Sequence, residues 1–283
     1  MSSELILTSL LQGLILTFVA YGVMIPFRLL TFPDLTAEGA YPLGGAVCAS
    51  VILAGGHPVI AVILAAIAAG VMGVGTAFIY LRFQVNTLLA GIILSTMLYS
   101  INLKVMGKPN IALFDQQILF TNYNTLTKVI VLFVIVVLLV APMILFFRTE
   151  LGLKLRAVGL NPGFAKRQGI SVAKYTILGL FMANCYTGFA GSIMVQIQNY
   201  MDIGMGIGIV IHALAAVMIG ESVIGSSSLN KQLLSPLVGA LIYQQLQGLA
   251  LYIGLAPGDL KFFTGSIVLS IIALRNLGHS ADK

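Results

Sequence analysis

The chain has 283 residues, of which 59% are hydrophobic and only 8% charged, whereas soluble domains carry roughly 25% charged residues. So few charges, with a mean hydropathy of +1.03, exclude a water-soluble fold of this length. The net charge of +6 lies in short connections and forms no basic face with interleaved aromatic residues, so we expect no nucleic-acid partner. The composition predicts an all-α, polytopic transmembrane helical bundle in the lipid bilayer, with residues 1–283 as a single domain.

Charge-free stretches give the membrane segments, because a helix needs about 20 apolar residues to cross the hydrocarbon core. Residues 39–81 are long enough for two passes with a turn at residues 55–58, and residues 203–220 form either a half-helix or a full pass. We expect about eight membrane segments, with broken or re-entrant helices among them. The stretches are residues 5–25, 39–81, 83–103, 129–147, 175–198, 203–220, 233–253 and 262–274.

The run FPDLTAEGAYPLGGA, residues 32–46, places two carboxylates directly before a long uncharged stretch. Carboxylates at membrane depth are costly and usually functional, so Glu38 is a candidate for lining a transport pathway. An ordinary turn, in which Asp34 caps a helix and Glu38 favours its first turn, fits the same residues equally well. Pro33, Pro42 and the neighbouring glycines predict that no continuous helix runs through this region.

Polar residues inside other apolar segments either bond between helices or line a polar route. His212 lies in a glycine-interrupted stretch, where it meets a substrate or a proton, or serves as a hydrogen-bonded packing residue. The candidate pathway residues are Thr36, Glu38, Asn86, Ser95, Tyr99, Asn184 and His212.

Small residues recur every four positions at Gly179, Ala183, Thr187 and Gly191, and form one stripe on a helix. Such a stripe lets another helix approach closely, either within one subunit or at a dimer seam.

The polar run RAVGLNPGFAKRQGI, residues 156–170, interrupts this apolar chain. Gly159 and Pro162 mark a turn, Asn161 is suited to cap a helix that starts at Pro162, and Gly169 is suited to end it. Because lysine and arginine concentrate on the side of this run, the positive-inside rule places the loop at about residues 148–174 and the C-terminus in the cytoplasm.

The sequence contains no phosphate-cradling loop with glycines followed by Lys and Ser or Thr, so we expect no ATPase site. The histidines and cysteines are not spaced along the chain like the ligands of a metal ion. They are His57, His212, His279, Cys48 and Cys185. We therefore expect no catalytic residues, no metal and no cofactor in this chain.

Several of these motifs resemble ABC importer permeases of the branched-chain amino acid and ribose type. The coupling-helix region of that family is similar to the following residues of this chain: Arg156-Ala157-Val158-Gly159, Asn161-Pro162, Ala165 and Gly169-Ile170. The run ALAAVMIG, residues 213–220, resembles its later apolar motif, and Asp34-Leu35-Thr36 with Gly39 resembles its early Asp-Leu-Ser-type element. PDLTAEGAYPLGGA and residues 88–110 are most similar to a subgroup labelled as tryptophan or tyrosine transporters.

The resemblance implies a homodimer of this permease in the bacterial cytoplasmic (inner) membrane, an ATP-binding subunit that holds ATP and Mg²⁺, and an extracytoplasmic substrate-binding protein. The substrate would be a small polar solute such as an aromatic or other amino acid. The residues matching the coupling region are Arg156, Ala157, Gly159, Asn161, Pro162, Lys166, Arg167 and Gly169.

Two other classes of protein stay open. A secondary transporter would be energised by an ion gradient, with Asp34, Glu38 or His212 as a proton relay. The third class is a membrane scaffold without transport activity.

Overall fold

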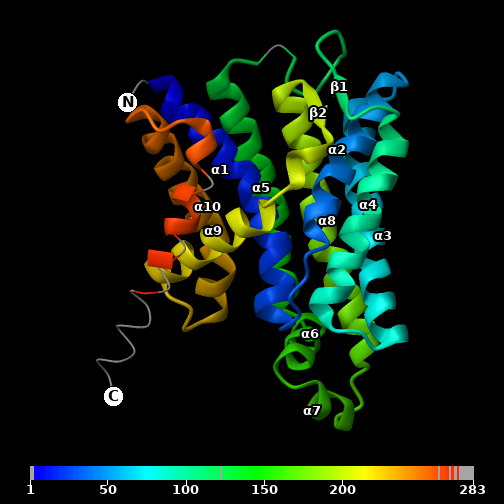
Figure 1. Ribbon diagram of the computed structural model, residues 1–283. Helices are drawn as coiled ribbons and strands as arrows, with labels where there is room; N and C mark the ends of the chain where they lie inside the picture. The colour runs from blue at the N-terminus through cyan, green and yellow to red at the C-terminus, as the bar shows by residue number, and fades with distance from the viewer. Residues whose placement is uncertain (1–2, 122, 261, 268, 271–272, 274–283) are drawn as a thin grey trace. The chain divides into compact units, whose positions relative to one another are not determined.

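The computed structural model describes residues 3–121, 123–260, 262–267, 269, 270 and 273, and these are mostly helical (Figure 1). Their contacts divide the chain into two compact units. Unit 1 comprises Met1–Ala20, Tyr123–Leu139 and Ile211–Lys283, and unit 2 comprises Tyr21–Asn122 and Val140–Val210. The expectation of one domain over residues 1–283 stays a prediction.

Six helices of the described chain are long and apolar enough to cross a membrane, which confirms the polytopic helical bundle. α2 (Ala37–Leu53) is apolar but shorter, and α10 (Leu229–Tyr252) is long enough but less apolar. The segment expected at residues 262–274 lies partly outside the described residues. The six spans are Glu4–Leu29, Pro58–Phe83, Thr87–Met106, Thr125–Arg148, Val172–Gln198 and Ile203–Ile224.

Small residues bring α2, α3 (Pro58–Phe83) and α8 (Val172–Gln198) into backbone contact in unit 2. A Cβ placed on Gly191 would meet the carbonyl oxygen of Tyr41 in α2. A Cβ on Gly73 of α3 would likewise meet the carbonyl oxygen of Leu180 in α8. The small-residue stripe on α8 is therefore used for close packing within this chain.

The predicted helix break at Pro42 is wrong, because α2 runs through it without interruption. Pro42 has no N–H to donate to the carbonyl oxygen of Glu38, one turn earlier. Gly206 packs against that oxygen, so its missing side chain makes room where the helix bond is lacking.

The break in this part of the chain lies before α2. α1 (Ser3–Met24) continues into a short π-helix, η1 (Ile25–Leu29), and residues 31–35 are non-helical. Thr31 has a φ of 51°, in the left-handed region that costs a non-glycine residue about 1–3 kcal/mol. Single-turn π-helices and strained residues of this kind cluster at functional sites.

The two ends of unit 2 differ in structure. One end carries α6 (Glu150–Leu160) and α7 (Pro162–Arg167), which lead into α8. At the far end of α8, β2 (Tyr200–Asp202) pairs antiparallel with β1 (Asn110–Ala112), with Ile111 opposite Met201. Figure 1 shows these features at opposite ends of α8. At 1.5 Å per residue the 27 residues of α8 span about 40 Å.

Residues 203–224 contain the expected glycine-interrupted segment. A 3₁₀ turn, η2 (Ile203–Gly206), is followed by Gly208 with a φ of 81° and then by α9 (Ile209–Ile224). In unit 1, α9 and α10 pack closely, because Cβ atoms on Gly220 and Gly239 would meet the carbonyl oxygens of Ser235 and Ala216.

We expect Gly191→Ala to lower the thermal stability of the purified protein, because the added methyl group must displace the α2 backbone at Tyr41. Overpacking of this kind costs about 1–3 kcal/mol. Gly75→Ala is the matched control, since its Cβ would meet only Leu94 side-chain atoms at ordinary distances of 3.4 and 3.7 Å. Equal melting temperatures of the two variants in detergent would contradict the packing described for α2 and α8.

Candidate functional site

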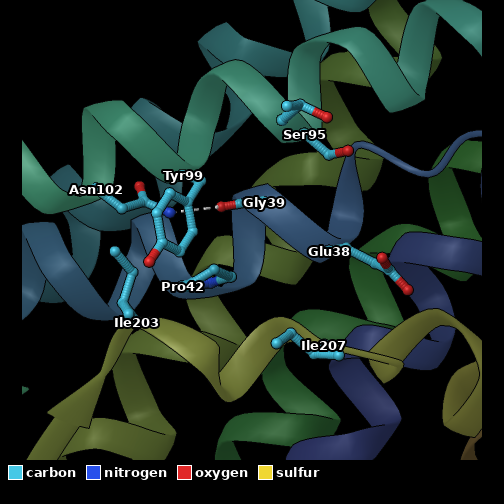
Figure 2. A pocket seen from close by; sticks show the side chains of 9 residues that line it. Glu38, Gly39, Pro42, Ser95, Tyr99, Asn102, Ile203 and Ile207 are labelled. Atoms are coloured by element: carbon cyan, nitrogen blue, oxygen red, sulfur yellow. Dashed lines mark hydrogen bonds between the residues drawn. The ribbon is translucent and has the colours of Figure 1, made fainter. Parts of the chain in front are cut away.

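A cavity of about 190 Å³ lies in unit 2 between the start of α2, the middle of α4 (Thr87–Met106) and the η2 segment (Figure 2). Its volume is below the roughly 300–1,000 Å³ of pockets for drug-sized ligands, so it suits a small solute. The lining residues are Glu38, Gly39, Pro42, Ser95, Thr96, Tyr99, Asn102, Ile203 and Ile207.

Glu38 reaches the cavity from the first turn of α2 and is about half-buried. The backbone N–H of Gly208 donates a hydrogen bond to its carboxylate. Glu38 thus occupies a first helical turn and lines a cavity at the same time, so the two interpretations of the sequence are compatible.

α4 forms the wall of the cavity opposite Glu38, with lining residues that are four and then three positions apart in the sequence. Ser95, Tyr99 and Asn102 lie on one helix face, and Figure 2 shows their side chains along the α4 ribbon. Asn102 is only 1% exposed and donates from Nδ2 to the carbonyl oxygen of Gly39, 3.2 Å away. This bond ties α4 to α2 beside the cavity.

Asp34 is the centre of a buried polar network next to the cavity. It is 1% exposed, its Oδ1 accepts from the backbone N–H of Thr36 at 2.8 Å, and its Oδ2 accepts from Asn184 Nδ2 at 3.2 Å. The Thr36 hydroxyl is in turn 2.6 Å from that of Thr76 in α3. The network therefore joins the non-helical residues before α2 to α3 and α8.

The structure brings only some of the candidate pathway residues together. Glu38, Ser95 and Tyr99 line the cavity, whereas Thr36 and Asn184 belong to the adjoining Asp34 network. Asn86 caps the start of α4, where its Oδ1 accepts from Leu88 N–H at 2.9 Å. His212 belongs to unit 1, where its ring lies 5.9 Å from that of Tyr243.

The capped helix expected within residues 156–170 is confirmed, whereas the turn expected at Gly159 is wrong, because Gly159 lies inside α6. Asn161 caps α7, with its Oδ1 accepting from Phe164 N–H at 2.9 Å, and Pro162 is the first residue of that helix. Gly169 has a φ of 75° beyond its end. Arg156, Ala157 and Gly159 lie on α6, while Lys166 and Arg167 are exposed at the end of α7.

α6 is fixed to the end of η1 by a backbone contact. A Cβ on Gly159 would coincide with the carbonyl oxygen of Leu29, and the Thr31 hydroxyl donates to the carbonyl oxygen of Gly159 at 2.9 Å. Since Thr31 lies only a few residues before Asp34 and Glu38, α6 is linked through this short segment to the network and the cavity.

The list of candidate pathway residues lacks several that line the cavity, although Thr96 and Asn102 are among the polar residues of the apolar segments. Thr96, Asn102, Pro42, Ile203 and Ile207 also line the cavity. The four-and-three spacing of Ser95, Tyr99 and Asn102 would have found Asn102, but nothing in the sequence places Ile203 and Ile207 opposite α4.

Two exposed apolar side chains at the α6–α7 corner were missed as well. Leu160 and Phe164 are 85% and 51% exposed. Leu160 ends α6, and Phe164 lies in α7, whose last turn carries Lys166 and Arg167. Among the described residues, no group of three or more His, Cys, Asp or Glu side chains is placed to hold a metal ion.

We expect Asp34→Ala to destabilise the protein, because Thr36 N–H and Asn184 Nδ2 lose the carboxylate oxygens to which they donate. A buried donor without a partner costs about 1–3 kcal/mol. The thermal stability of the purified variant in detergent measures this loss, with Asp115→Ala in an exposed turn as the control. A melting temperature of Asp34→Ala equal to that of the control would show that the network contributes nothing.

Comparison with known proteins identifies the family. The sequence model of the family described as the permease component of branched-chain amino acid transport systems matches residues 5–273. No solved structure matches the chain.

Three curated proteins are similar to this chain. A tyrosine transport system permease protein of Clostridioides difficile is 34% identical over 98% of this chain and 94% of its own length. An uncharacterized protein of Rickettsia prowazekii is 31% identical over 94% of this chain and 95% of its own length. A nucleoside ABC transporter permease protein of Lactococcus lactis is 28% identical over 53% of this chain and 40% of its own length.

The match to the family model covers nearly the whole chain, and the first two relatives are covered almost end to end. The family consists of transporter subunits that are not themselves enzymes, in agreement with the six span-length helices. This multi-pass membrane protein belongs to the permease family of the branched-chain amino acid transport systems.

Proposed function

We propose that this chain is the permease subunit of a bacterial ABC importer, and that it is driven by ATP hydrolysis in a separate subunit that docks on α6 and α7. ATP and Mg²⁺ bind to that partner. The observation that carries the proposal is the α6–α7 corner, which is exposed at its tip and fixed at its base to the chain leading to the cavity.

The tip of this corner suits a protein partner. It presents the apolar side chains of Leu160 and Phe164 beside the cationic side chains of Lys166 and Arg167. Lys154 on α6 is already paired with Glu150, and this hydrogen-bonded ion pair lowers the pKa of the Glu150 carboxyl. An acidic, partly apolar groove on the ATP-binding subunit would complement the tip.

The base of the corner suits the transmission of movement. Gly159 contacts Leu29 and Thr31, and a few residues further on lie the Asp34 network and Glu38. A displacement of α6 must therefore shift the end of η1 and the non-helical residues that precede α2. The partner's affinity for ATP must differ between the outward-open and inward-open states for this coupling to work.

We assign the cavity lined by Glu38, Ser95 and Tyr99 to the substrate pathway, together with the neighbouring Thr36 and Asn184. Asn86 and His212 remain weaker candidates, because neither is among the residues that line this cavity. The substrate is a small polar solute, and the relative named as a tyrosine permease favours an amino acid.

The complete importer comprises two copies of this chain, the ATP-binding subunits and an extracytoplasmic substrate-binding protein. It lies in the cytoplasmic (inner) membrane of a bacterium, with α6, α7 and the C-terminus in the cytoplasm. The family resemblance and the concentration of lysine and arginine near α6 and α7 support this arrangement.

Copurification separates this function from a secondary transporter. An ATPase subunit retained by the affinity-tagged chain, and uptake into proteoliposomes that requires internal ATP and the binding protein, would support the proposal. Uptake by the chain alone, driven by a proton or sodium gradient, would support the secondary transporter and overturn it.

We expect Gly159→Ala to uncouple the importer, because its methyl group would displace the carbonyl oxygen of Leu29 and disturb the base of the corner. Uptake should fall about fivefold or more while the ATPase subunit still copurifies and hydrolyses ATP. The estimate corresponds to an overpacking cost of about 1–3 kcal/mol. Gly75→Ala again serves as the control.

We expect Asn161→Ala to weaken coupling as well, because the loss of an N-cap costs a helix about 0.5–2 kcal/mol and α7 has only 6 residues. Uptake per ATP hydrolysed is the quantity to measure. Full uptake by both Gly159→Ala and Asn161→Ala would exclude α6 and α7 as the coupling element.

A further inference from the structure

The cavity of unit 2 presents mostly acceptors to a ligand, although the hydroxyl of Tyr99 among its lining residues can donate. Glu38 carries the single formal charge among its described lining residues, and that charge is negative. Its carboxylate receives one backbone hydrogen bond, from Gly208, and two carboxylate oxygens together offer about four acceptor sites. Glu38 therefore retains unused acceptor capacity.

The hydroxyl groups of α4 add acceptors and not donors. Ser95 Oγ and Thr96 Oγ1 both donate their protons to the carbonyl oxygen of Ile92, at 3.0 and 2.8 Å. A hydroxyl group whose proton is used in this way offers only its lone pairs to a ligand.

Asn102 adds no accessible acceptor. Its Nδ2 is bound to the carbonyl oxygen of Gly39, whereas its Oδ1 is buried and has no hydrogen-bond partner in the described part of the chain. This oxygen has almost no accessible surface, so it offers a ligand in the cavity no contact.

The backbone donors of the non-α4 lining residues are used inside the protein. Glu38 and Gly39 donate to Leu35 and Thr36, and Pro42 has no N–H. Ile203 donates to Pro109, and Ile207 to Gly204. In α4 the backbone N–H groups are taken up by the helix itself. An anionic ligand would therefore meet Glu38 without a compensating cation or free backbone donor from these residues.

Apolar groups complete the wall. Pro42, Ile203 and Ile207 line the cavity, and the ring of Tyr99 lies between α4 and Ile203 (Figure 2). In this view the Glu38 carboxylate lies towards one end, and Tyr99 and Ile203 towards the other. A solute with a cationic end and an apolar body matches this division.

We propose that the cavity binds small solutes through a protonated ammonium group, with Glu38 as counter-ion, the oxygens of Ser95 and Thr96 as further acceptors, and Pro42, Tyr99 and Ile203 against the apolar body. The proposal rests on the pathway assigned above and narrows its substrate to amines and amino acids. Sugars and nucleosides, which lack a cationic group, leave Glu38 without a counter-ion.

The test uses the full chain in lipid nanodiscs and four probes on one hydrocarbon skeleton: isopentylamine, leucine, isocaproate and isopentyl alcohol. A ligand that binds the folded state raises the melting temperature with a concentration dependence that gives its Kd. We expect isopentylamine to bind and isocaproate and isopentyl alcohol not to bind at millimolar concentration. Leucine distinguishes amino acids from simple amines as the source of the ammonium group. If leucine binds, the ligands of the site include amino acids. If it does not bind, the site is restricted to amines without a carboxylate.

Glu38→Gln keeps the shape of the side chain and removes its charge. We expect it to weaken binding of isopentylamine about tenfold or more, since hydrogen bonds to charged groups are worth about 1.5–3 kcal/mol. Glu38→Asp keeps the charge and should still discriminate between the amine and the acid. Glu150→Gln, which removes an exposed carboxylate on α6, should leave binding unchanged.

Binding of isocaproate as tight as that of isopentylamine, an unchanged affinity in Glu38→Gln, or binding of none of the probes would each overturn the proposal. If Glu38→Gln does not fold, two measurements decide the question. These are the comparison of the four probes on the unmodified chain and the binding to Glu38→Asp. Because these experiments need no ATPase subunit, they succeed or fail independently of the ATP-driven uptake that tests the proposed function.

Discussion

Residues 30–36 form a non-helical connection among helices of span length, and because Leu30, Phe32, Asp34 and Thr36 are buried, its backbone must find hydrogen-bond partners within the protein. The backbone N–H groups of Leu30 and Phe32 donate to the carbonyl oxygens of Ile25 and Pro26 in η1, and that of Thr36 donates to Asp34 Oδ1. Asp34 is in turn held by Asn184 of α8. This small set of bonds fixes where α2 begins, and with it the position of Glu38.

The same connection joins two regions that are far apart in sequence. Thr31 is bonded to Gly159 across 128 positions of the chain, and Gly91 of α4 lies so close to Leu35 and Asp34 that a Cβ there would meet both. The strained φ of Thr31 persists because its hydroxyl is bonded and its neighbours are packed. A polar connection bonded at several points has few ways to relax, so under the proposed mechanism a displacement of α6 would be passed to the cavity wall.

Glycine packing provides the rigid surroundings for this connection. α2, α3 and α8 touch through Gly44, Gly73, Gly188 and Gly191, where backbone atoms occupy the space of the missing side chains. Helices this close gain dispersion contacts in place of the hydrophobic effect, which lipid does not supply between spans. The cavity lies at the edge of this packed group, where α4 and the η2 segment leave room for a solute.

The sequence by itself determined the membrane class, most helix positions, the turn at residues 55–58, the small-residue stripe of α8 and the capped helix beginning at Pro162, because hydropathy, glycine spacing and capping residues act over short distances along the chain. It also pointed to Glu38, Ser95 and Tyr99, since polar residues are rare in apolar segments. Only the tertiary structure decided that α2 continues through Pro42, that Asp34 meets Asn184, and that Ile203 and Ile207 close the cavity opposite α4. These features depend on contacts across tens to more than a hundred residues, and the close approach of two backbones leaves no local pattern from which it could be inferred.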